Sequence, residues 1–200
     1  MREFNIVVIG VGGQGIITSM QVIAQAALNQ GYDVKTSELH GLAQRGGSVP
    51  CHIRFGKKVY SPLVMEGEAH LIIALEPMEA LRACYFASKE NGTKFLINTY
   101  RITPLSIPIL KLNYPKIEEI NDTVRKFASK VIAFNASRIV KIETNSIIPT
   151  NVFMLGFAVA KNMIPLKKEC FVQSIDQMIP KRFLELNHRV FELGYKAGLP

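Results

Sequence analysis

Four glycines and a glutamine lie within six positions near the amino terminus, in the stretch GVGGQG at residues 10–15. The stretch follows an apolar run at residues 4–9 and precedes apolar residues at helical spacing from residue 16. Glycine backbones approach a ligand closely, and the first N–H groups of a helix attract phosphate. We therefore predict an anion-binding turn between a strand and a helix. Its candidate ligand-binding residues are Gly10, Gly12, Gly13, Gln14 and Gly15.

A second polar segment, SELHGLAQRGGS at residues 37–48, follows the next predicted strand. Its paired glycines allow backbone N–H groups to form a concave anion nest, and Arg45 can offer two parallel hydrogen bonds to a phosphate or carboxylate. Loops after the first two strands of an open α/β sheet lie together at its carboxyl edge, so we expect both segments to share one cleft. The alternative is a surface loop whose arginine and glutamine bind backbone carbonyls. The candidate residues of this segment are Glu38, His40, Gln44, Arg45, Gly46, Gly47 and Ser48.

The glycine turn taken alone also fits a nucleotide-dependent oxidoreductase that binds NAD(P) or FAD. Glu38 lies at about the distance along the chain where a ribose-binding acid is expected. However, residues 39–48 are too few for a crossover helix, and a hairpin is predicted next at residues 49–63. The usual dinucleotide domain is therefore disfavoured, and this function remains as the alternative.

The elements predicted around these segments make one α/β domain that spans residues 1–200. The fold class is a three-layer arrangement, with a mostly parallel sheet flanked by helices and a Rossmann-like start that carries an inserted β-hairpin. Predicted strands cover residues 4–9, 33–37, 49–55, 59–63, 71–75, 94–97 and 130–134. Predicted helices start at residues 16 and 77 or cover residues 117–128, 150–163, 167–178 and 181–197. The helix at 150–163 is almost wholly apolar, which places it in the interior or at an interface.

Charge and composition limit the classes of partner. The formal net charge of +8 suits phosphate-bearing ligands, an acidic partner or nucleic acid, or is simply a solvated basic surface. No helix-turn-helix, cysteine–histidine finger or aromatic stacking strip is present, so we expect no nucleic-acid partner. No apolar run reaches the roughly 20 residues that cross a bilayer, and no signal peptide is recognised, so we expect no membrane and a cytoplasmic protein. Cys51, Cys84 and Cys170 stand far apart, and we predict buried thiols rather than metal ligands.

Several motifs occur together in order. They are GVGGQGI, SELHGLAQRGGSV, ALEPMEALR at 74–82, INTYRITP at 97–104, NVFMLGFAVA at 151–160 and VFELGYKAG at 190–198. In this combination the chain resembles the gamma-type domain of 2-oxoacid:ferredoxin oxidoreductases over about residues 4–195. Among these it is most similar to the free-standing beta subunits of indolepyruvate:ferredoxin oxidoreductases. His70 departs from the acidic residue expected before its strand, and we interpret it as a surface change.

The resemblance implies an accessory role in the oxidation of aryl 2-oxo acids to their acyl-coenzyme A esters, with electrons passed to ferredoxin. The family's thiamine diphosphate site needs a G-D-G motif, which this sequence lacks, and cysteines for iron–sulfur clusters are also missing. The resemblance therefore places thiamine diphosphate, Mg²⁺ and 4Fe-4S clusters on a large alpha subunit. This chain alone is expected to bind no cofactor and to be inactive, and to meet ferredoxin and coenzyme A only within the complex.

Two roles remain open for residues 10–15 and 37–48, which we call the first and second glycine segments, in such a complex. With Arg45, they form a phosphate-recognising surface that helps to bind coenzyme A or completes the substrate channel. Alternatively, the same segments dock the partner subunit.

Overall fold

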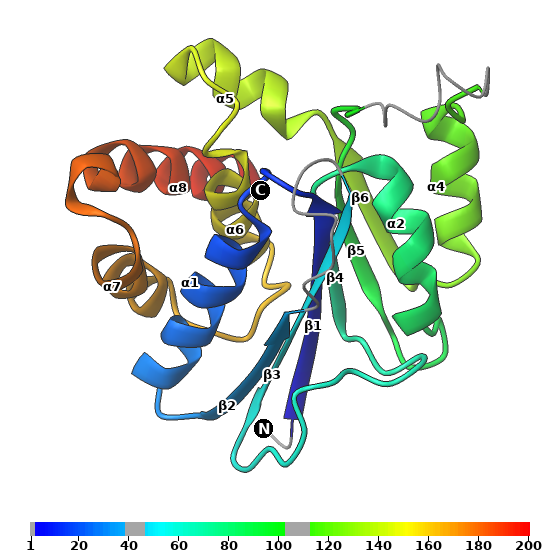
Figure 1. Cartoon of the computed structure of the whole chain (residues 1–200), viewed down its shortest axis with the longest axis horizontal. Coiled ribbons are helices and arrows are strands. Elements are labelled where there is room, and N and C mark those ends of the chain that lie inside the picture. Colours follow the sequence, from blue (N-terminus) through cyan, green and yellow to red (C-terminus); the bar gives the residue numbers. More distant parts are fainter. Residues whose placement is uncertain (1–2, 39–46, 103–112) are drawn as a thin grey trace.

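A six-stranded sheet forms the middle of three layers, with helices on both of its faces (Figure 1). The computed structural model describes residues 3–38, 47–102 and 113–200. In these residues the strand order is β2-β3-β1-β4-β5-β6. The strands are β1 (Glu3–Val11), β2 (Asp33–Glu38), β3 (Ser48–Gly56), β4 (Leu71–Ala74), β5 (Lys94–Asn98) and β6 (Lys130–Phe134). The predicted three-layer α/β fold is confirmed.

Strand β1 lies in the interior of the sheet and is buried on both faces. Ile6 and Val8 belong to the core on one side, and Val7 and Ile9 belong to the core on the other side. A strand covered on both faces needs apolar residues at successive positions, which explains the continuous apolar run. The turn that follows β1 is therefore held on a rigid, buried strand.

Strand β3 runs antiparallel to both of its neighbours, β1 and β2, whereas β1, β4, β5 and β6 are parallel. The predicted antiparallel insertion is present, but its hairpin partner was predicted wrongly. The second strand is β2, and residues 59–63 form no strand. Because β1 and β2 occupy both edges of β3, no edge is left to pair with residues 59–63, and Pro62 lacks the N–H of a ladder.

In the described parts of the chain, helices cover both faces of the sheet. On the first face lie α1 (Ile16–Asn29), α6 (Thr150–Ala160), α7 (Lys168–Met178) and α8 (Leu184–Gly198) (Figure 1). The opposite face carries α2 (Pro77–Ala83) and α4 (Ile117–Arg125). Short 3-10 turns at Cys84–Phe86 and Lys181–Phe183 continue α2 and precede α8. Helix α5 (Ala136–Thr144), which we did not predict, follows β6.

Helix α6 lies in the interior rather than at an interface. Ten of its eleven residues are buried, and it packs against α8 through glycines on both helices. A Cβ at Gly156 would lie 2.1 Å from the carbonyl oxygen of Phe191, and one at Gly194 would lie 2.1 Å from that of Phe153. The two helix backbones are therefore in direct contact. The apolar side chains of α6 are buried by other parts of this chain.

Two histidines accept hydrogen bonds from backbone N–H groups, and burial lowers the pKa of each. His52 Nδ1 accepts from the Val64 N–H at 3.2 Å, and its Nε2 is buried with no partner among the described residues. His70 Nδ1 accepts from the Asn5 N–H at 3.0 Å, and its ring stacks on Phe4. His70 is thus half-buried and ties β4 to β1, so the predicted surface position is wrong.

We expect the protein to lose stability as the pH falls below about 6.5, because the unfolded histidines take up protons that the folded ones resist. The stabilisation is complete above that pH and is lost as the pH falls through the lowered folded pKa values. Each histidine contributes at most about 1.4 kcal/mol per pH unit. Urea unfolding at pH 7.5 and 5.5 measures this loss.

The variant His52→Asn is the matched control, because an amide oxygen can accept the Val64 N–H without titrating. Its loss of stability between the two pH values should be smaller than that of the parent. Burial raises the pKa of Glu76, which acts in the opposite direction, but this group is the same in both proteins. An equal loss in both would contradict the assignment to His52.

Candidate functional site

The candidate site lies where the connections of the sheet diverge. The chain leaves β1 through α1 on one face toward β2, and it leaves β4 through α2 on the other face toward β5. The carboxyl ends of β1 and β4 are neighbours in the sheet. Ligands of open α/β sheets bind in the crevice at such a switch point. The glycine turn at residues 10–15 occupies this position.

The glycines of this turn are required by its backbone and its close contacts. Gly13 and Gly15 have φ angles of 99° and 75°, in the left-handed region that favours glycine. A Cβ at Gly15 would also lie 2.7 Å from Asn151 Nδ2, and one at Gly10 would lie 2.7 Å from Gln14 Oε1. The turn is therefore packed against its own glutamine and against the start of α6.

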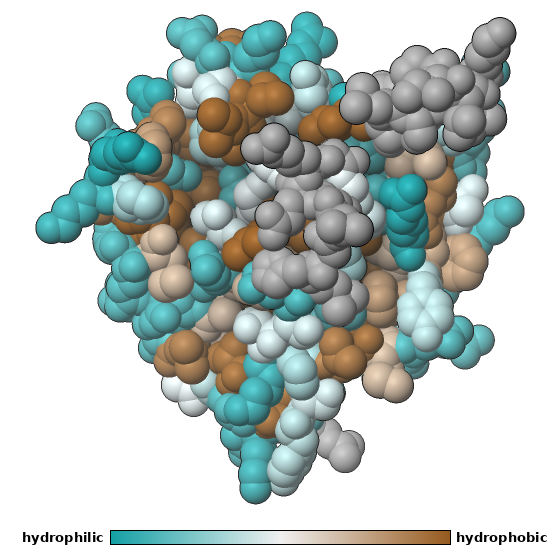
Figure 2. Space-filling view, viewed as in Figure 1, coloured by the Kyte–Doolittle hydropathy of each residue, from teal (hydrophilic) through white to brown (hydrophobic). Residues whose placement is uncertain are grey.

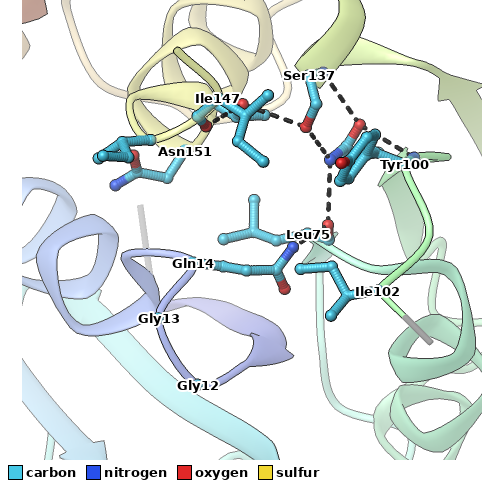
Figure 3. Close-up of a pocket in the computed structure, with 12 residues that line it drawn as sticks. Gly12, Gly13, Gln14, Leu75, Tyr100, Ile102, Ser137, Ile147 and Asn151 are labelled. Atoms are coloured by element: carbon cyan, nitrogen blue, oxygen red, sulfur yellow. Dashed lines mark hydrogen bonds between the residues drawn. The ribbon is translucent and has the colours of Figure 1, made fainter. Parts of the chain in front are cut away.

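Gln14 connects two strands through its side-chain amide. Its Oε1 accepts from the Val11 N–H at 2.7 Å, and its Nε2 donates to the Leu75 carbonyl at 2.8 Å (Figure 3). The partners lie at the carboxyl ends of β1 and β4. The geometry thus gives the Gln14 amide a structural role in shaping the turn.

The described end of the second glycine segment contacts the glycine turn. The Gly12 N–H donates to the Gly47 carbonyl at 3.0 Å, so the chain itself uses this donor. The Ser48 hydroxyl donates to the carboxylate of Glu79, which is buried and also paired with Arg82. His40, Gln44, Arg45 and Gly46, which we predicted as site residues, lie outside the described residues.

Glu38 lies farther from the turn than a ribose-binding acid would. It ends β2, opposite Cys51 of β3, and β3 separates β2 from β1. Two strand spacings amount to about 10 Å. The inserted strand therefore removes the arrangement in which an acid at the end of the second strand faces a dinucleotide held at the first.

A cavity of about 230 Å³ opens beside the glycine turn (Figure 3). It lies at the carboxyl ends of β1, β4 and β5 and at the starts of α5 and α6. The lining residues are Gly12, Gly13, Gln14, Leu75, Asn98, Tyr100, Ile102, Ser137, Ile147, Ile148, Thr150 and Asn151. We refer to it as the switch-point cavity.

A closed hydrogen-bond network forms the floor of the switch-point cavity (Figure 3). Asn98, which is fully buried, donates from Nδ2 to the Leu75 carbonyl at 3.1 Å and to the Ser137 hydroxyl at 2.9 Å. The hydroxyls of Ser137 and Thr150 lie 3.2 Å apart, and Thr150 donates to the Ile147 carbonyl at 2.6 Å. These polar groups satisfy one another and hold the ends of β4 and β5 against α5 and α6.

A buried carboxylate follows Leu75 directly in the chain, outside the lining of the cavity. Glu76 caps α2 by accepting from the Met78 N–H at 2.7 Å, and it also accepts from the Tyr114 hydroxyl at 2.5 Å. The Ile102 N–H lies 3.4 Å from the same carboxylate. Burial raises the pKa of Glu76, and the hydrogen bonds oppose that rise. Glu76 thus holds the residues on both sides of segment 103–112.

A second, more open cavity of about 510 Å³ adjoins the first and shares Gly13, Ile148 and Asn151 with it. Its wall is largely apolar. Ile148 and Phe183 on its lining are 79% and 43% exposed. In Figure 2, hydrophobic residues lie just below the mostly hydrophilic upper edge of the molecule, in the region where Figure 1 places α5. We refer to this second cavity as the apolar groove.

We did not predict the cavity residues at the end of β5 and at the starts of α5 and α6. They are Asn98, Ser137, Thr150 and Asn151, and they come from three segments that are far apart in the chain. One signal was available for Asn98, because a polar residue ends the apolar strand KFLIN at the carboxyl edge, where ligands bind. The others become neighbours only through the tertiary fold.

The described residues offer little for metal binding. No group of three histidine, cysteine or acidic side chains there could hold a metal ion. Burial raises the pKa of both the Cys51 and Cys84 thiols to about 11, which opposes the thiolate form that metals bind. Cys170 is only half-buried, in contrast to the prediction. None of the helices in the described ranges is long and apolar enough to cross a bilayer.

Residues 5–197 match the family model described as pyruvate ferredoxin/flavodoxin oxidoreductase. The chain belongs to this family. A relative in it is the indolepyruvate oxidoreductase subunit IorB of Archaeoglobus fulgidus, 40% identical over 98% of this chain and 96% of that protein.

Two solved structures of ferredoxin oxidoreductases share the fold. The gamma subunit of a keto/oxoacid ferredoxin oxidoreductase from Geobacter sulfurreducens PCA has a TM-score of 0.69 and 21% identity, with 98% of each chain covered. The 2-oxoglutarate:ferredoxin oxidoreductase of Magnetococcus marinus, which holds 2-oxoglutarate, coenzyme A and succinyl-CoA, has a TM-score of 0.73 and 18% identity. The match covers 99% of this chain and 31% of that one. The resemblance to gamma-type domains is confirmed, and this member of the pyruvate ferredoxin/flavodoxin oxidoreductase family is an oxidoreductase subunit.

Proposed function

We propose that this chain is the small beta subunit of an indolepyruvate:ferredoxin oxidoreductase in the cytoplasm. Within the complex it supports the oxidative decarboxylation of aryl 2-oxo acids to acyl-coenzyme A esters. The observation that carries the proposal is the 40% identity to an indolepyruvate oxidoreductase subunit over nearly the whole of both chains. The net charge of +8 suits an acidic partner subunit and an anionic coenzyme.

The redox cofactors of the complex belong on a larger alpha subunit in this proposal. Bound there, thiamine diphosphate with Mg²⁺ would provide the chemistry of decarboxylation, and 4Fe-4S clusters would provide electron transfer. The described residues do not suit these groups, since Cys51 and Cys84 are isolated, buried thiols with raised pKa values. The role of this chain is therefore to bind and to position.

The second glycine segment, with Arg45, is our candidate for recognising the phosphate groups of coenzyme A. Gly47 lies against the glycine turn at the switch point, which supports a ligand at this edge of the sheet. The Gly12 N–H is already bonded to the Gly47 carbonyl, so this donor of the turn is not free for a phosphate. In this proposal Arg45 supplies the positive charge that binds the phosphate, and the glycine turn forms one side of the binding site.

We expect Arg45→Ala to raise the KM for coenzyme A about 10- to 100-fold in the assembled enzyme. A hydrogen bond to a charged group contributes about 1.5–3 kcal/mol, which corresponds to that range. Steady-state kinetics with the partner subunit present measure it. Arg138→Ala, an exposed arginine on α5 outside both glycine segments, is the control and should leave the KM unchanged.

Docking of the partner subunit is the competing role, and the apolar groove favours it. Its exposed Ile148 and Phe183 form the kind of surface that interfaces cover. If the glycine segments dock the partner, Arg45→Ala reduces co-purification of the two subunits instead of changing the KM. An unchanged KM together with intact assembly would reject the phosphate role.

A nucleotide-dependent oxidoreductase remains the alternative function, but the geometry argues against it. Glu38 is separated from β1 by β3, and the Gly12 N–H is bonded to Gly47. Titration of the full chain with NAD(P)H or FAD tests this, and saturable micromolar binding would restore the alternative.

A further inference from the structure

The walls of the switch-point cavity are apolar above its hydrogen-bonded floor. Leu75 and Ile147 face each other across it, and the ring of Tyr100 and the side chain of Ile102 close one side (Figure 3). Pockets for whole drug-sized ligands measure roughly 300–1,000 Å³. At about 230 Å³ this cavity suits one planar ring system.

The starts of α5 and α6 use N–H groups for hydrogen bonds within the chain. In α5, the Ser137 N–H donates to Asn98 Oδ1 and the Arg138 N–H donates to Asn135 Oδ1. In α6, the Thr150 N–H donates to the Ile147 carbonyl. The remaining partial positive charge of the helix starts disfavours a cation. The chemistry that fits best is therefore an uncharged ring.

Asn151 lines both the switch-point cavity and the apolar groove, and its side-chain amide has one oxygen that can accept a hydrogen bond. Its Nδ2 donates to the Gly15 carbonyl at 3.0 Å and to the Ser19 hydroxyl at 3.2 Å. A carbonyl can only accept, so these contacts fix which branch of the amide is nitrogen. The residue is 4% exposed, and its Oδ1 accepts no hydrogen bond from the described residues. A ring that carries an N–H donor would satisfy this oxygen.

We propose that the switch-point cavity binds an uncharged planar heteroaromatic ring, packed between Leu75, Tyr100 and Ile147, whose N–H donates to Asn151 Oδ1. The inference rests on the proposed function, in which two molecules carry such a ring. One is the purine base of coenzyme A, and the other is the indole ring of an aryl 2-oxo acid. The site is separate from the phosphate contacts proposed for Arg45.

Titration of the full-length chain with adenosine and with indole tests the site, because neither probe contains phosphate. We expect one of them to bind with a Kd of about 0.1–1 mM, which is usual for weak ligands of about 10–20 non-hydrogen atoms. Labelled isoleucine methyl groups locate the ring by NMR, since Ile102, Ile147 and Ile148 line the cavity. Adenosine binding indicates the base of the coenzyme, and indole binding indicates the substrate ring.

Cavity-filling variants provide the decisive comparison. Ile147→Trp should weaken binding at least tenfold, whereas Ile142→Trp, at an exposed position of α5 outside the lining, should leave it unchanged. Tyr100→Leu removes the aromatic ring from one side of the cavity. It replaces Ile147→Trp as the test variant if Ile147→Trp does not fold. Absence of binding by both probes, or binding that Ile147→Trp and Tyr100→Leu leave intact, overturns the proposal.

Arg45→Ala separates this inference from the proposed function. It should leave binding of the phosphate-free rings unchanged while raising the KM for coenzyme A in the complex. Loss of ring binding in Arg45→Ala would overturn the separate ring site. Ring binding without any KM effect rejects only the phosphate role.

Discussion

Gly156→Ala is expected to lower the free energy of unfolding by more than about 3 kcal/mol. The added Cβ would lie 2.1 Å from the Phe191 carbonyl oxygen, which is backbone and cannot rotate away. Helices α6 and α8 must then separate along a contact that lies in the main core. Overpacking of a core costs about 1–3 kcal/mol and more where backbone must move. Thermal unfolding should show a Tm lower by about 6–12 °C or more.

The matching substitution on the other helix, Gly194→Ala, should have a similar effect, because its Cβ would meet the Phe153 carbonyl oxygen at the same distance. Ala197→Ser on the exposed side of α8 is the control, and it should change stability by less than about 0.5 kcal/mol. Retention of parent stability by Gly156→Ala would show that the two helices pack less closely than described.

The second large effect is expected for Gln14→Ala, at about 2–3 kcal/mol of lost stability. The substitution leaves the Val11 N–H without its partner and removes one of the two side-chain donors to the Leu75 carbonyl. Each buried polar group left unpaired costs about 1–3 kcal/mol. Urea unfolding of the isolated chain measures this without any ligand.

Gln21→Ala is the control for Gln14→Ala, because Gln21 is exposed on α1 and alanine favours a helix. Its stability should equal or slightly exceed that of the parent. If Gln14 served only a ligand, Gln14→Ala would unfold like the parent, and the structural role assigned to the amide would be wrong.

The sequence predicted the fold where the pattern was local. The apolar run of β1, the helical spacing of α1 and the helices α7 and α8 were recognisable because burial on one or both faces repeats along the chain. The partner of β3 was predicted wrongly, since pairing depends on which edges remain free after the sheet assembles. Helix α5 was missed because it is short and only a third of its nine residues are buried.

At the site, too, local features could be predicted from the sequence and long-range contacts could not. The turn at residues 10–15 between a strand and a helix was predicted from residue types and spacing, and the structure has it there. The role of Gln14 was not, because its Leu75 partner lies 61 residues away along the chain. Asn151 gains its neighbours only when α1 and α6 come together, so no spacing in the sequence predicts its role, whereas Asn98 was indicated only by its place at the end of an apolar strand.

The antiparallel course of β3 has a further consequence for binding energy. Nine residue pairs align β1 with β3, ending at Val11 opposite Ser48, so both glycine segments emerge from the same end of one ladder. The separation of Val11 and Ser48 is therefore set when the sheet forms and not when a ligand arrives. A ligand that contacts the chain at both of these ladder ends loses little affinity to bringing them together, and substitutions that loosen this ladder should act chiefly on the rate of ligand release.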